Sequence, residues 1–206
     1  MELALPALSG DSPAVEGYLS QAGFSLDTVR AALEIKRLAG QVNVLVHAAG
    51  ILASLPYILE PGERIESLSL GAGNTGKDFD LTTDRRVGEF KFIGWRGGAE
   101  SIRQNQVFKD YLKLLWDQSE RRKQLFLTGT KEALAFLRAG RALESVLSKD
   151  VGVKAKFFES YGDRFTKVGD FYRVVEAEVE IIDLRQIVPV FATAVVPGDD
   201  PSGEER

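Results

Sequence analysis

The segment from residue 77 to 92 constrains the fold most, because apolar and polar side chains alternate on both sides of a short polar turn. The pattern is Phe-Asp-Leu at 79–81 and Phe-Lys-Phe at 90–92. Alternation with a period of two predicts strands that have one apolar and one polar face. The polar residues at 83–86 supply the turn chemistry between them. The segment therefore predicts two neighbouring strands joined by a tight connection.

The polar positions of these two strands carry a set of residues with a chemical use. Glu89 and Lys91 are two residues apart, so both side chains leave the same face of their strand, and Asp80 can lie across from them. Hard divalent ions prefer carboxylate and carbonyl oxygens. Asp80, Glu89 and the backbone carbonyl of Phe90 are therefore candidate ligands of Mg²⁺ or Mn²⁺.

Lys91 would position or help to deprotonate an attacking water, or offset the charge that builds on a phosphate. The alternative interpretation is a solvated hairpin whose charges form surface ion pairs of small energetic value.

The stretch resembles the PD-(D/E)XK nuclease superfamily, which has the restriction-endonuclease-like fold. Asp80 matches the strand aspartate of that family, and Glu89-Phe90-Lys91 matches its (D/E)-x-K motif. The family core runs helix, three-stranded meander, helix, strand, and this order can be followed from about residue 41 to 128. The motif is short and degenerate, and the proline that precedes the family's aspartate is replaced by Phe79 here. The resemblance implies a metal-dependent (endo)nuclease with a central mixed sheet flanked by helices.

The segment that follows the motif predicts a helix from 100 to 116, after the break at Gly97-Gly98. One apolar stripe on this helix consists of Val107, Phe108, Tyr111, Leu114 and Leu115. Gln104 continues the stripe, and Arg103 lies at its edge. In the resembled family this helix often carries a glutamine or a basic residue directed at the catalytic strand, which makes Gln104 a candidate catalytic residue. The alternative is a glutamine that caps local backbone groups. Lys109 and Lys113 lie off the stripe and are expected to be solvated.

Charge is distributed unevenly along the chain. The formal net charge is −4, yet the stretch from Arg85 to Lys123 carries ten basic and five acidic residues. This basic stretch surrounds the candidate site, where attraction of phosphate would be useful. Arg96 and Arg103 are therefore candidate nucleic-acid contacts, with DNA as the expected partner and a homodimer as a further possibility.

Length and composition limit the remaining classes. A chain of 206 residues, 44% of them hydrophobic, can bury the core of one domain, expected at 13–195 with mobile tails at 1–12 and 197–206. The absence of cysteine excludes disulfides and thiolate metal sites, and a single histidine excludes a multi-histidine zinc site. Residues 1–13 lack the basic start of a signal peptide, so a cytoplasmic location is expected.

Residues 41–59 contain no charged side chain, which raises the possibility of a membrane span. Polar residues dilute the segment, so a buried helix with Asn43, His47, Gly50 and Ser54 on one narrow face is the preferred interpretation, without a membrane. His47 is expected to be a hydrogen-bonded core histidine.

The remaining elements follow from periodicity and turn residues. An amphipathic helix is predicted at 26–38 and is interrupted at Gly40. Strands are predicted at 63–70, 78–82, 87–93 and 123–128, a helix at 131–148, and an additional strand within 173–184. Residues 150–171 remain without an assignment.

Two motifs suggest other functions. Residues 71–76 satisfy G-x-G-x-x-G, but a strand-like segment follows them where a dinucleotide fingerprint needs a helix, so a hairpin turn is the better interpretation. Residues 42–50 resemble a strand-end motif of short-chain dehydrogenases, but the chain lacks the Tyr-x-x-x-Lys pair of that family.

The sequence therefore favours a Mg²⁺-dependent nuclease of the α/β class with a restriction-endonuclease-like core. The first alternative is a catalytically inactive module of the same fold that binds nucleic acid or has a structural role. A more remote alternative is an NAD-linked dehydrogenase.

Overall fold

A computed structural model describes residues 17, 23, 26–71, 78–92, 94–95 and 100–193. The chain divides into two compact units, Met1–Leu45 and Val46–Arg206, and the predicted single domain at 13–195 spans both. The predicted tails, the glycine-rich residues 72–77 and Arg96 lie outside the described residues.

Helix α2 runs without a break from Leu26 to Ile58. The predicted interruption at Gly40 is therefore wrong, because a single glycine costs a helix about 1 kcal/mol without ending it. By length and composition, Asp27–Ile58 could cross a membrane. In the first unit, α2 exposes the apolar residues Val29, Leu33, Ile35, Leu38, Val42 and Leu45.

The prediction of a buried helix at 41–59 holds only for part of the segment. Asn43 is exposed and His47 is half-buried, whereas Gly50 and Ser54 are buried. At Gly50 an added Cβ would lie 2.4 Å from the ring of Phe92, so only glycine allows this approach. The second unit therefore uses one face of the last turns of α2.

A five-stranded open sheet forms the centre of the second unit, in the order β1-β2-β3-β4-β5. The strands are β1 (Ile65–Leu68), β2 (Leu81–Thr83), β3 (Arg86–Lys91), β4 (Arg122–Leu127) and β5 (Glu180–Asp183). The first three strands pair antiparallel, and β3, β4 and β5 pair parallel. Parallel neighbours need a crossover, which α3 (Glu100–Leu115) supplies between β3 and β4. The predicted α/β class with a mixed sheet flanked by helices is confirmed.

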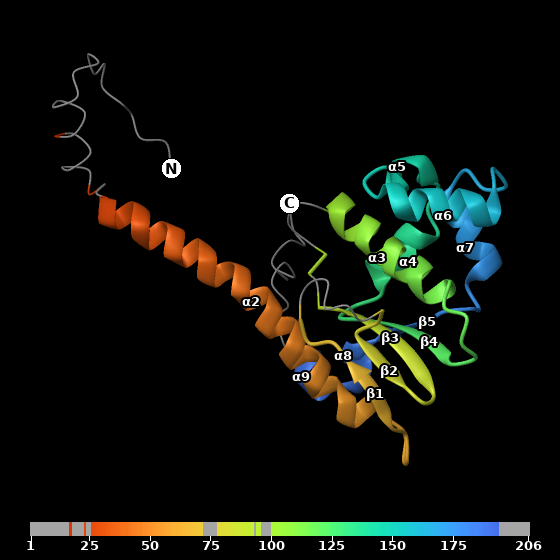
Figure 1. Ribbon diagram of the computed structural model, residues 1–206, viewed down its shortest axis with the longest axis horizontal. Helices are drawn as coiled ribbons and strands as arrows, with labels where there is room; N and C mark the ends of the chain where they lie inside the picture. Colours follow the sequence, from red (N-terminus) through yellow and green to blue (C-terminus); the bar gives the residue numbers. More distant parts are fainter. Residues whose placement is uncertain are drawn as a thin grey trace, which may run out of the picture. The chain divides into compact units, whose positions relative to one another are not determined.

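Two apolar cores cover the two faces of the sheet (Figure 1). On one face lie α3, α4 (Lys131–Leu137), α5 (Leu143–Leu147), α6 (Val151–Tyr161) and α7 (Val168–Val175). On the other lie the last turns of α2, α8 (Leu184–Ile187) and α9 (Pro189–Thr193). The rings of Phe90 and Phe126 stack at 4.5 Å in this second core. Alternation along β3 therefore sends Phe90 toward α2 and its neighbours Glu89 and Lys91 toward α3.

Three predicted elements differ from the structure. The strand predicted at 78–82 is β2 only from Leu81 to Thr83, so Asp80 lies outside it. The predicted helix at 131–148 is two helices, α4 and α5, because the intervening residues bond to a distant segment: Leu143 N–H donates to the Thr166 carbonyl and Val168 N–H to the Arg141 carbonyl. The predicted strand within 173–184 is β5 only from Glu180. Residues 173–175 of that predicted strand are instead the last residues of α7. In this helix Val168, Phe171, Tyr172 and Val175 are buried at helical spacing.

Candidate active site

Asp80 lies directly before β2, and its carboxylate is held from two sides. Its Oδ2 accepts a hydrogen bond of 2.9 Å from the backbone N–H of Phe90, and its Oδ1 lies 3.3 Å from Nε2 of His47. Burial raises the pKa of Asp80, but the contacts with His47 and Phe90 outweigh burial and bring this pKa below its ordinary value. Asp80 is therefore an ionised carboxylate at neutral pH, fixed against the backbone of β3.

Glu89 and Lys91 point from β3 into the layer between the sheet and α3. Glu89 pairs in register with Leu125 and Lys91 with Leu127, and both leucines belong to the core beneath α3. Glu89 Oε1 accepts a hydrogen bond of 2.5 Å from Nζ of Lys113. The predicted common face of Glu89 and Lys91 is thus the face that α3 covers.

Lys91 forms an ion pair with Asp110, a residue of α3. The distance from Lys91 Nζ to Asp110 Oδ2 is 2.8 Å, and the two side chains are 24% and 14% exposed. Burial lowers the pKa of Lys91, but the charges of Asp110, Glu89 and Asp80 outweigh burial and raise it above its ordinary value. Lys91 therefore remains an ammonium ion across the neutral range.

Glu89 has the most perturbed environment of the site. Burial raises its pKa, the negative charges of Asp110 and Asp80 raise it further, and Lys113 offsets only part of this, so that the pKa of Glu89 is about 8. The side chain is 5% exposed. The negative charges of Asp110 and Asp80 thus act on a poorly solvated Glu89, and Lys113 offsets only part of their effect.

A divalent cation would relieve this excess of negative charge. The Asp80 carboxylate lies just before β2 and the Glu89 carboxylate lies on β3, and Asp80 accepts a hydrogen bond from the backbone N–H of Phe90. These oxygens are the ligands that Mg²⁺ prefers, with water completing its coordination. Within the described residues, no three His, Asp or Glu side chains gather closely enough to hold an ion by themselves. An ion at this place would therefore have at most two carboxylate ligands, Asp80 and Glu89, and would depend on a backbone carbonyl and water for the rest.

Gln104 has other partners than those predicted. Its Nε2 donates to Glu100 Oε1 at 2.9 Å, and its Oε1 accepts from Arg141. It does not contact Glu89 or Lys91 through any hydrogen bond of the described residues, although Val107, Phe108 and Tyr111 are buried as predicted. The reason is position: Gln104 lies in the first turns of α3, and the residue of α3 that reaches Lys91 is Asp110, six positions further on.

Of the two predicted nucleic-acid contacts, Arg96 and Arg103, only Arg103 lies among the described residues. Arg103 Nη1 donates to the Trp95 carbonyl at 3.3 Å. Lys109 and Lys113 were expected to be solvated, but Lys109 pairs with Asp150 at 2.5 Å and Lys113 with Glu89. The prediction for Lys113 is wrong, since α3 packs so closely on β3 that a residue beside the stripe reaches the sheet.

Asp110, Lys113 and His47 join the site without having been predicted to act there. Asp110 had a signal in the sequence, because Val107, Asp110, Tyr111 and Leu114 follow the i, i+3, i+4, i+7 pattern of one helical face. A charged residue within such an apolar stripe needs a buried partner. The single histidine, His47, offered no comparable signal, because its contact depends on how α2 packs on the sheet.

The residues 42–50, which resemble a dehydrogenase motif, are helical in α2, so the strand that this motif requires is absent from that segment.

Comparison with protein-family models, with curated proteins and with solved structures gave no match for this chain.

Proposed function

We propose that the protein is a divalent-metal-dependent nuclease of the PD-(D/E)XK type that hydrolyses phosphodiester bonds, with DNA as the substrate. The observation that carries this proposal is the placement of Glu89 and Lys91 on one face of β3, where Glu89 contacts Lys113 and Lys91 contacts Asp110, with the Asp80 carboxylate bonded to the backbone of the same strand at Phe90. Perturbed titratable groups that face one another in this way are typical of functional sites.

The arrangement of the elements supports the same proposal. A helix, an antiparallel meander (β1 to β3), a crossover helix and a parallel strand follow one another from α2 to β4. This is the order that the resemblance to the nuclease superfamily implies. Fold alone does not determine function, so the weight of the proposal rests on the side chains.

Each side chain then has a role. Asp80 and Glu89, with the Phe90 carbonyl, would hold Mg²⁺ or Mn²⁺, and the ion would supply a Lewis acid that activates water and neutralises charge on the phosphate. Lys91 remains protonated because of Asp110, so it acts as a hydrogen-bond donor to the scissile phosphate or the attacking water and not as a base. His47 and Asp110 are positioning residues, since they orient Asp80 and Lys91.

A binding module without catalytic activity is the second candidate, and one contact favours it. Lys113 already occupies Oε1 of Glu89 at 2.5 Å, and the raised pKa of Glu89 leaves this carboxyl largely protonated at neutral pH. If the ion pair persists in the presence of metal, Glu89 is not a ligand and the module binds nucleic acid without cleaving it.

Cleavage assays separate the two candidates. Purified protein is incubated with end-labelled DNA and RNA in Mg²⁺ or Mn²⁺, with EDTA as the control. Wild type is expected to cleave DNA, and Lys91→Ala to lose roughly 10²–10³-fold in rate, the scale for removal of one group that stabilises transition-state charge. Lys131→Ala is the matched control, because Lys131 is an exposed lysine of α4. Equal rates for wild type and Lys91→Ala would contradict the nuclease proposal.

A further inference from the structure

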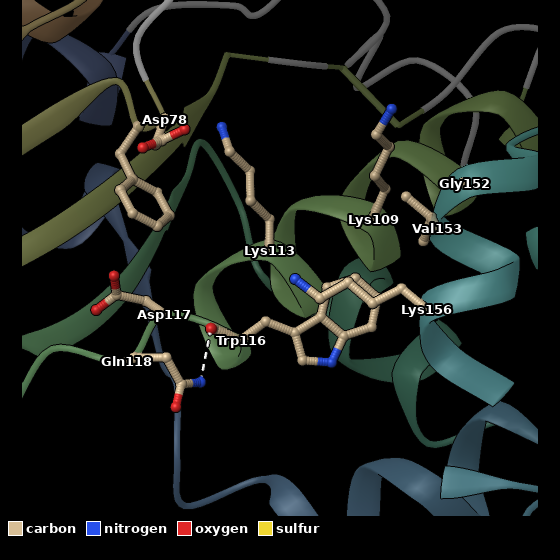
Figure 2. A pocket seen from close by; sticks show the side chains of 10 residues that line it. Asp78, Lys109, Lys113, Trp116, Asp117, Gln118, Gly152, Val153 and Lys156 are labelled. Carbon is tan, nitrogen blue, oxygen red and sulfur yellow. Dashed lines mark hydrogen bonds between the residues drawn. The ribbon is translucent and has the colours of Figure 1, made fainter. Parts of the chain in front are cut away.

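A pocket of about 420 Å³ opens beside the candidate active site (Figure 2). Its walls come from the residues before β2, from one side of α3 and the turn after it, and from the start of α6. The pocket lining includes two aromatic residues and three lysines: Phe79, Trp116, Lys109, Lys113 and Lys156.

Three lysines line this one pocket. Lys109 and Lys113 are four residues apart on α3 and so project from the same side of that helix, while Lys156 comes from α6. Lys113 Nζ lies 5.1 Å from the centre of the Phe79 ring, and Lys156 Nζ lies 4.5 Å from that of Trp116. The aromatic rings thus hold two ammonium groups in place through cation–π contacts.

The acidic residues do not cancel this charge at every lysine. Asp78 and Asp117 also line the pocket, and the Asp117 carboxylate accepts hydrogen bonds from the backbone and hydroxyl of Ser119. Among the residues that the structure describes, no carboxylate lies within ion-pair distance of Lys156. Among the described residues, the pocket therefore presents one ammonium group without a carboxylate partner, that of Lys156, next to Lys109 and Lys113, which pair with Asp150 and Glu89.

Lys113 connects the pocket to the candidate active site. Its side chain lines the pocket, and the same Nζ donates to Glu89. An anion bound between the lysines would therefore lie one side chain away from the carboxylate proposed to hold the metal. Successive phosphates of one nucleic-acid strand are separated by only a few ångströms. A strand whose scissile phosphate lies at the proposed metal site can therefore place a neighbouring phosphate in the pocket.

We infer that this lysine pocket is a binding subsite for a backbone phosphate of the nucleic-acid strand, adjacent to the phosphate that is cleaved. The inference rests on the proposed function, since it assigns the substrate's path away from the site. Contacts of lysine with phosphate strengthen binding without reading the base sequence.

The test measures binding without cleavage. Full-length protein in EDTA is titrated into fluorescently labelled single-stranded DNA, duplex DNA and single-stranded RNA at several salt concentrations. The pocket variant is Lys109→Ala/Lys156→Ala, and the control is Lys131→Ala/Lys149→Ala, which removes two exposed lysines outside the pocket. The melting temperature of each variant verifies that it is folded.

The pocket variant is expected to bind about tenfold more weakly or worse, and its slope of log K against log salt should fall by about 0.7–0.9, the value for one lost phosphate contact. The control should keep the wild-type affinity and slope. The three nucleic acids identify which strand type gains most from the pocket.

Two outcomes would overturn the inference: equal affinity of pocket variant and wild type for every nucleic acid, or an equal loss in the control. Cleavage by wild type in Mg²⁺, compared with Lys91→Ala, decides the proposed function independently. A wild type that cleaves, with a pocket variant that binds normally, refutes the pocket alone. A wild type that binds through the pocket and never cleaves refutes the nuclease alone.

Discussion

Glu89 should make the free protein less stable as pH rises, and Glu89→Gln should remove this effect. A pKa of about 8 in the folded state, against 4.5 for an ordinary glutamate, means that the folded protein keeps a proton that the unfolded chain releases between these values. The unfolded state then binds fewer protons than the native state, so stability falls as pH rises through this window, and the destabilisation due to Glu89 reaches its full size above the folded-state pKa.

The magnitude follows from the shift. One pKa unit corresponds to about 1.4 kcal/mol, so the shift gives an upper bound of roughly 5 kcal/mol at pH above 8. Lys113 is 40% exposed, so water enters the pair and relaxation reduces the cost. We expect Glu89→Gln to raise the free energy of unfolding by about 2–4 kcal/mol over wild type at pH 8.5. At pH 4.5 the difference should be small, because the folded state and much of the unfolded state carry the proton.

The assay is urea unfolding in EDTA at pH 4.5, 6.5 and 8.5. Glu159→Gln serves as the control, because Glu159 is an exposed glutamate of α6. Mg²⁺ or Mn²⁺ should then stabilise wild type at pH 8.5 and not Glu89→Gln, since only the wild type offers the ionised ligand. If Glu89→Gln shifts stability no more than Glu159→Gln at pH 8.5, Glu89 is not held in its neutral form.

Two further substitutions test the surroundings of the site. Arg86→Met should cost about 3–5 kcal/mol in urea unfolding, because the Glu63 carboxylate, fully buried and 2.6 Å from Arg86, loses its partner; a loss below 1 kcal/mol would show that water compensates Glu63. Asp110→Asn should lower the cleavage rate by about 10–100-fold while the protein remains folded, since Lys91 loses the carboxylate that orients it; an unchanged rate would remove Asp110 from the proposed mechanism.

Local alternation predicted two of the strands around the site closely and a third only in part. The strand predicted at 78–82 is β2 only from Leu81, and Phe79 and Leu81, predicted on one face, lie in different cores. The strands at 87–93 and 123–128 correspond to β3 and β4 within two residues at each end. The pattern succeeded because β3 has an apolar side chain on one face at Phe90 and polar ones on the other at Glu89 and Lys91. The same alternation predicted the common face of Glu89 and Lys91, whereas Asp80 contacts the backbone of Phe90 and the ring of His47.

Long-range packing explains what the sequence did not reveal. The end of α4 depends on hydrogen bonds between residues 139–143 and residues 166–169, which no local periodicity encodes. The same holds in the site: Lys113 reaches Glu89, and His47 reaches Asp80, only because α3 and α2 pack on opposite faces of the sheet. Gln104 was assigned to the site from its position in the stripe, but the distance along α3 places Asp110 at Lys91 instead.

The most direct test of the central claim is a crystal structure of the protein soaked with Mn²⁺, with the ion located by its anomalous scattering. We expect one ion bound at about 2.0–2.3 Å by the carboxylates of Asp80 and Glu89 and by the Phe90 carbonyl, with Lys113 displaced from Glu89. An ion bound elsewhere, or no ion with the Glu89–Lys113 pair intact at saturating Mn²⁺ and pH above 8, would contradict the account.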